Sequence, residues 1–216
     1  MSEIIENPNL QDENSTIGNK TAVVAIIGRP SVGKSTFLKT LGINILLAQT
    51  IHTCMASKFK MPFCSLYTSM SLKDNLSLKE SYYMAEIKAI KRILDAAREE
   101  KMIVCMVDEV LRGTNTVERI AASTQILKGM SAANIMCLAA THDVELTRTL
   151  EKEYDNYHFK EEIEENDIFF SYKILNGRAQ SRNAIKLLNI MGYPEEIIRE
   201  AENLASTFLK TGDWKS

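Results

Sequence analysis

Residues 28–36 read GRPSVGKST and match the pattern G-x-x-x-x-G-K-[ST] in full. The two glycines permit a tight loop whose backbone N–H groups, together with the start of the following helix, can surround a phosphate. Lys34 would then place its charge between the β- and γ-phosphates, and the Ser35 hydroxyl can ligate Mg²⁺. The predicted phosphate-binding residues are Gly28, Arg29, Pro30, Ser31, Val32, Gly33, Lys34, Ser35 and Thr36.

The flanking sequence predicts the α/β context that this loop needs. Three short, wholly apolar runs, AVVAII (22–27), MIVCMV (102–107) and NIMCLAA (134–140), are typical of strands buried on both faces of a parallel sheet. Helical periodicity lies between them. Helices are predicted over 36–49, from Ser81 and over 117–129, followed by two C-terminal amphipathic helices. Further strands are predicted over 54–59 and 63–70, and an antiparallel edge pair over 157–163 and 168–175.

An acidic pair, Asp108-Glu109, follows the second apolar run directly. If that strand neighbours the first, Asp108 can bind Mg²⁺ through its water shell and Glu109 can activate the water that attacks the γ-phosphate. A solvated acidic strand end is the commoner explanation of such a pair in isolation. The phosphate loop favours the catalytic interpretation, because active sites of open α/β sheets form at the carboxyl ends of strands.

The third apolar run ends in Thr141-His142-Asp143, at the same expected edge. His142 is predicted to hydrogen-bond the γ-phosphate or the attacking water. The alternative is that Asp143 caps the next helix while His142 packs locally.

Composition indicates an ordinary globular protein of 216 residues, with 45% hydrophobic and 25% charged residues. The formal net charge of −2 provides no overall basic field for nucleic acid, so DNA contacts are expected only through domains outside this chain. No apolar stretch is long enough to span a membrane, and the acidic, polar residues 1–10 are unlike a signal peptide. The four cysteines lack C-x-x-C spacing, so a cytoplasmic location with reduced thiols is expected.

The order of motifs resembles the ATPase domain of the MutS family of DNA mismatch-repair proteins, which is close to the ABC ATPases. The resemblance rests on five stretches: residues 28–49, ESYYMAE (80–86), Asp108-Glu109 with RGTN (112–115), ATHD (140–143) and residues 176–201. It implies an α/β P-loop NTPase with a mostly parallel central sheet flanked by helices, antiparallel edge strands and a C-terminal helix-turn-helix. The expected divisions are a lead-in (1–20), an ATPase core (21–176) and a helical dimerisation segment (177–216).

The same resemblance implies Mg²⁺-dependent hydrolysis of ATP in a homodimer with two composite sites, coupled to rearrangement of the dimer. Ser81 matches the family's signature serine, which reaches the γ-phosphate held by the other subunit; its plain alternative is a helix cap. The RGTN loop would lie along the dimer seam. Pro30 and Ser31 depart from the family's usual Asn and Met, and Pro30 lacks a backbone donor. Two alternatives therefore stay open: a nucleotide-gated dimerisation module with little hydrolysis, and an ABC-type ATPase of another pathway.

Overall fold

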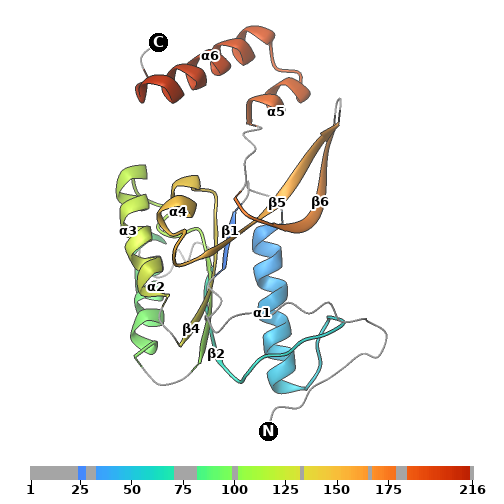
Figure 1. The fold of residues 1–216 in the computed structure, drawn as a ribbon, viewed down its shortest axis with the longest axis vertical. Helices are drawn as coiled ribbons and strands as arrows, with labels where there is room; N and C mark the ends of the chain where they lie inside the picture. The colour runs from blue at the N-terminus through green and yellow to red at the C-terminus, as the bar shows by residue number, and fades with distance from the viewer. Residues whose placement is uncertain are drawn as a thin grey trace. The chain divides into compact units, whose positions relative to one another are not determined.

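The computed structural model describes residues 24–27, 33–70, 82–98, 102–131, 134–164, 167–178 and 184–214. They form six strands and six helices that largely alternate along the chain (Figure 1). In chain order the elements are β1 (Val24–Ile27), α1 (Lys34–Thr50), β2 (Ser65–Ser69), α2 (Tyr82–Ala96), β3 (Ile103–Asp108), α3 (Thr116–Gly129), β4 (Ile135–Thr141), α4 (Val144–Thr149), β5 (Asp155–Glu164), β6 (Asp167–Asn176), α5 (Ala184–Ile190) and α6 (Glu195–Thr211).

The strands form one sheet in the order β2-β3-β4-β1-β5-β6. The four pairings from β2 through to β5 are all parallel, which confirms a mixed α/β fold around a mostly parallel sheet. Only two residues separate β5 from its neighbour β6, so these two strands run antiparallel, because a parallel neighbour would need a long crossover. The predicted antiparallel pair at the sheet edge agrees with this order, and its first strand, β5, also pairs in parallel with β1.

The expectation that the strand before Asp108 adjoins the first strand is wrong. Strand β4 lies between β1 and β3, pairing Ile27 with Thr141 on one side and Asp108 with Ala140 on the other. Apolar runs of similar composition suit any interior position of a parallel sheet, so the sequence carries no signal for this order. The carboxyl ends of the three strands nevertheless meet at one edge.

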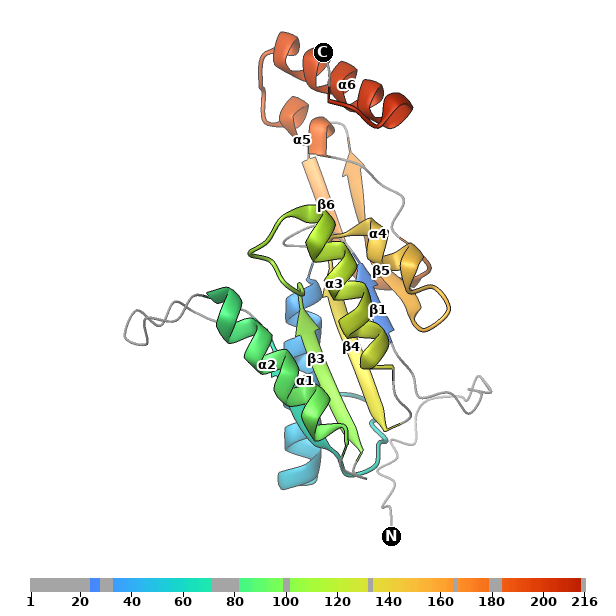
Figure 2. The same ribbon diagram turned by 90° about the vertical axis from the view of Figure 1, so that its left-hand side faces the viewer.

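Both faces of β3 are buried, as its unbroken apolar sequence predicts. Figure 1 shows α1 on one face of the sheet with α2 and α3 on the other, and the turned view in Figure 2 agrees. Met106 faces α1, where its sulfur lies 3.3 Å from the position that a β-carbon on Gly42 would occupy. The alternate residues Cys105 and Val107 belong to the core on the opposite face.

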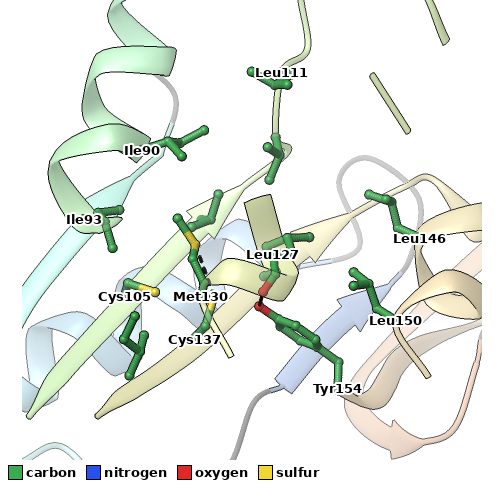
Figure 3. Close-up of a cluster of buried hydrophobic side chains, with 14 of the residues drawn as sticks. Ile90, Ile93, Cys105, Leu111, Leu127, Met130, Cys137, Leu146, Leu150 and Tyr154 are labelled. Carbon is green, nitrogen blue, oxygen red and sulfur yellow. Dashed lines mark hydrogen bonds between the residues drawn. The ribbon is translucent and has the colours of Figure 1, made fainter. Parts of the chain in front are cut away.

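That opposite core joins α2, α3 and α4 to the sheet (Figure 3). Its members include Ile90 and Ile93 of α2, Leu127 of α3, and Leu146 and Leu150 beside α4. Tyr154 is 3% exposed and closes the cluster, donating its hydroxyl to the Leu127 carbonyl at 2.8 Å. Burial raises the pKa of this phenol far above its ordinary value. The hydroxyl therefore stays a neutral donor that ties β5 to α3.

Removal of this hydroxyl alone tests how much its hydrogen bond contributes to stability. Tyr154→Phe is expected to lower the free energy of unfolding by about 1–2 kcal/mol, because a buried hydrogen bond is lost. The half-exposed Tyr193, at 50%, provides the matched control, and Tyr193→Phe should leave stability unchanged. Urea denaturation of both variants checks this. An equal change in the free energy of unfolding in the two variants would show that the hydroxyl of Tyr154 does not tie β5 to α3.

The predicted strand over 54–59 does not form. Asn44 of α1 instead accepts from the Met55 amide in this range at 2.5 Å, and Gln49 accepts from the Cys64 amide at 2.6 Å, just before β2. Side-chain acceptors thus replace a strand partner, and Met55 remains 78% exposed. The strand predicted over 63–70 is confirmed as the shorter β2.

The chain divides into two compact units, Met1–Lys160 with Tyr172–Ala179, and Glu161–Ser171 with Gln180–Ser216. In the second unit α5 packs on α6, and Phe208 stacks on Trp214 with ring centroids 4.0 Å apart. No described helix is both long and apolar enough to span a bilayer.

Candidate active site at the carboxyl edge of the sheet

Three of the predicted motifs follow strands at the same edge of the sheet. The register that pairs Ile27 with Thr141 and Ala140 with Asp108 brings the ends of β1, β4 and β3 level. The phosphate-loop sequence follows β1, the acidic pair ends β3, and His142 follows β4. Parallel pairing thus brings together groups that are more than a hundred residues apart in sequence.

The phosphate-loop sequence enters α1 through a glycine in a left-handed conformation. Gly33 has φ 104°, a left-handed value that favours glycine, and its carbonyl accepts from the Phe37 amide at 2.8 Å. Among the described residues, no side chain caps this helix end, and its first turn contains no acidic residue. An uncapped helix N-terminus favours an anion. Lys34 is only 4% exposed, whereas Thr36 is exposed.

Tyr172 of β6 is a site residue that the sequence reasoning missed. Its ring lies 3.2 Å from the position that a β-carbon on Gly33 would occupy, yet the residue is 65% exposed. An exposed aromatic ring beside a phosphate loop suits stacking on a flat ligand. Its neighbours in sequence carry no motif, so only the pairing of β6 beyond β5 could have revealed this position.

Glu109 is buried and has both carboxylate oxygens occupied. Arg112 donates to Oε2 from Nε at 2.6 Å and from a terminal nitrogen at 2.5 Å, and His142 Nδ1 lies 3.1 Å from Oε1. Burial alone would raise the pKa of Glu109, but the hydrogen bonds and charges of Arg112 and His142 outweigh it and hold the pKa below its ordinary value. Glu109 is thus an ionised acceptor oriented by two donors.

The structure brings His142 and Asp143 together with a residue that sequence reasoning did not single out. Asp143 occupies the N-cap position of α4, but its carboxylate does not cap the helix. It accepts from Arg119 Nε at 3.0 Å and from a terminal nitrogen at 2.8 Å, a bidentate pair whose side chains are 16% and 9% exposed. The hydrogen bond from Arg119 to Asp143 raises the pKa of the guanidinium. The pair anchors the segment that carries His142, which is itself 42% exposed.

The turn after Glu109 is fixed from several sides. Ser123 Oγ donates to the Val110 carbonyl at 3.2 Å, and Glu86 of α2 accepts from the Leu111 amide at 2.5 Å. Asn115 caps α3 by accepting from the Glu118 amide at 3.0 Å. Hydrogen bonds therefore hold the predicted loop over 112–115 at both of its ends.

The remaining predicted residues divide into those described and those not. Gly28, Arg29, Pro30, Ser31, Val32 and Ser81 lie outside the described residues. Ser35, in the first turn of α1, and Asp108, at the end of β3, are both partly exposed. Their hydroxyl and carboxylate are hard oxygen donors that suit Mg²⁺, which usually keeps waters and phosphate oxygens as its other ligands. Among the described residues, no group of three or more His, Cys, Asp and Glu could hold a metal by itself.

Comparison with known proteins assigns the family. The family model of MutS domain V matches residues 24–209. The chain is similar to the DNA mismatch repair protein MutS of Aquifex pyrophilus, with 34% identity over 83% of the chain and 21% of that protein. It is also similar to the MutS proteins of Thermus thermophilus, with 29% identity over 85% of the chain and 23% of that protein, and of Thermotoga petrophila, with 28% identity over 96% of the chain and 26% of that protein. The chain thus spans about a quarter of the length of these relatives. It belongs to the MutS family, and the matched region is MutS domain V.

Proposed function

We propose that this chain is a P-loop NTPase domain that binds Mg²⁺-ATP, hydrolyses it to ADP and phosphate, and couples this cycle to rearrangement of a homodimer in a MutS-like mismatch-repair protein. The observation that carries the proposal is the contact between Glu109 and His142 at 3.1 Å, at the sheet edge where β1 leads into the phosphate-loop sequence. A buried carboxylate and an imidazole at this place suit activation of water beside a terminal phosphate.

Each residue then has a distinct task. The N-terminus of α1 and Lys34 bind the phosphates, and Lys34 stabilises the charge that develops on transfer. Ser35 and Asp108 would hold Mg²⁺, which supplies neutralisation of phosphate charge when bound. Glu109 accepts the proton of the attacking water, and His142, oriented through the Arg119–Asp143 pair, hydrogen-bonds the γ-phosphate. Ser81 would complete the site of the partner subunit.

The exposed ring of Tyr172 is proposed to stack on the nucleotide base. Tyr172→Ala is expected to weaken Mg²⁺-ATP binding about tenfold, because stacking of a base on an aromatic ring contributes about 1–3 kcal/mol. Tyr172→Phe keeps the ring and should bind as the wild type does. Titration calorimetry with ATP and with inorganic triphosphate tests this, since the loss should appear only for the ligand that carries a base. An equal loss for both ligands would refute stacking.

One observation favours the second candidate, a nucleotide-gated dimerisation module with little hydrolysis. Both oxygens of Glu109 are engaged by Arg112 and His142, and these partners hold the pKa of Glu109 low, which makes it a weak base. Steady-state ATPase measured against protein concentration separates the candidates. A specific activity that rises steeply with concentration supports composite sites in a dimer, whereas tight Mg²⁺-ATP binding without turnover supports the module.

A further inference from the structure

The side chain of Glu86 crosses from α2 to the turn that follows β3. Its Oε1 accepts from the Leu111 amide at 2.5 Å, and the backbone of the next residue, Arg112, lowers the pKa of the same carboxylate. The residue is half-buried, and this burial raises the pKa of Glu86 although the backbone of both residues and the Arg112 charge oppose the rise. A partly desolvated carboxylate that accepts from a backbone amide of another element has a structural role and is not an ordinary solvated surface acid.

The turn that Glu86 holds is conformationally strained. Glu109 has φ 60° and Leu111 has φ 58°, left-handed values that cost free energy in residues other than glycine. Such conformations persist only where the surroundings determine them fully. Three further contacts contribute: Glu109 donates its amide to the Ala140 carbonyl at 2.8 Å, Ser123 holds Val110, and Leu111 is buried in the core that Figure 3 shows.

The conformation of this turn determines where the Glu109 carboxylate lies. Arg112 binds that carboxylate with its guanidinium, and its neighbour Leu111 donates its amide to Glu86, so two adjacent residues connect the two acids. A turn released from Glu86 would be free to relax at Leu111, and Arg112 would then no longer be fixed opposite Glu109. Misplacement by about 1 Å is enough to reduce a catalytic rate a hundredfold.

We propose that Glu86 is a positioning residue that ties α2 to the turn after β3 through the amide of Leu111 and thereby orients Glu109. This inference rests on the proposed ATPase function. It also implies that α2 links two parts of the site. The helix begins directly after Ser81 in sequence, and Ser81 is the residue expected to reach the partner's nucleotide. Movement of α2 would then change the position of the Glu109 carboxylate.

The first test needs no activity. In Glu86→Ala, hydrogen exchange at the Leu111 amide, followed by NMR on the whole chain, should accelerate at least about tenfold, while exchange at Met106 in β3 stays as in the wild type. Glu86→Gln, which keeps one acceptor oxygen, should give a smaller change and carries the test if the alanine variant does not fold. Glu153→Gln, which alters a carboxylate paired with Lys128 at 3.6 Å, is the control and should change neither amide. Unchanged exchange in Glu86→Ala would overturn the link.

The second test reads the effect on turnover. We expect kcat to fall about tenfold in Glu86→Gln and about a hundredfold in Glu86→Ala, with the Kd for Mg²⁺-ATP within about twofold of wild type. In the Glu109→Gln background, Glu86→Ala should cause no further loss, because it acts through the carboxylate already removed. A full further loss there, or a loss of nucleotide affinity equal to the loss of kcat, would refute the positioning role. Absence of turnover in the wild-type chain would instead refute the proposed function, and the exchange experiment would still decide whether Glu86 fastens the turn.

Discussion

Glu109→Gln should bind Mg²⁺-ATP as tightly as the wild type and lose about a thousandfold in kcat, because a general base contributes typically 10²–10⁴-fold. Glutamine keeps the size of the side chain but cannot accept a proton from water at neutral pH. Lys34 and the start of α1, which bind the phosphates in our proposal, are untouched by the change. The variant should therefore keep its nucleotide affinity and lose its turnover.

The contacts of Glu109 indicate what must be measured beside turnover. Arg112 and His142 both donate to the carboxylate, and a glutamine offers only one acceptor oxygen together with an NH₂ group. One of the two contacts is therefore lost in the variant, and its melting temperature must be shown to stay close to that of the wild type. Glu145→Gln, at an exposed acid in the first turn of α4, is the matched control and should change neither quantity. Phosphate release by Glu109→Gln at the wild-type rate would show that Glu109 is not the base.

The sequence was sufficient to predict the elements that carry the site. The apolar runs before Gly28, Asp108 and His142 predicted β1, β3 and β4 to within two residues at either end, because strands buried on both faces leave an unbroken apolar signature. The sheet edge followed from the same pattern, since parallel strands place all their carboxyl ends together. These predictions depend on local composition and on a general rule of sheet architecture, so a single sequence is enough to make them.

The strand order and the long-range side-chain contacts could not be predicted from the sequence, for a physical reason. The place of β4 between β1 and β3 depends on how whole elements pack, and no local pattern distinguishes one interior strand from another. The Arg119–Asp143 pair joins α3 to the start of α4 across 24 residues, and each side chain alone reads as an ordinary surface charge. Tyr172 reaches Gly33 only because β5 and β6 extend the sheet beyond β1. Such contacts follow from the fold and are visible only once it is known.

The second large effect is expected at the Arg119–Asp143 pair. Asp143→Ala should lower the free energy of unfolding by about 3 kcal/mol, because it leaves a largely buried guanidinium without its bidentate partner. Asp143 does not cap α4 with its side chain, so loss of a helix cap contributes nothing to this change. The cost should come from the uncompensated charge of Arg119. Removal of that charge in the double variant Arg119→Met with Asp143→Ala should therefore restore a large part of the lost stability.

A double-mutant cycle by urea denaturation measures this coupling, and the chain contains a natural control. Lys91 and Asp95 also form an ion pair, at 2.5 Å, but their side chains are 69% and 46% exposed, so Asp95→Ala should cause no measurable change. The two pairs differ in burial and in geometry, because Arg119 binds Asp143 with two nitrogens across 24 residues, whereas Lys91 binds Asp95 with one nitrogen four residues along the same helix. If Asp143→Ala proves as neutral as Asp95→Ala, the pair does not anchor the segment that follows β4. His142 would then approach Glu109 without support from Arg119, and its orientation would have to come from Glu109 alone.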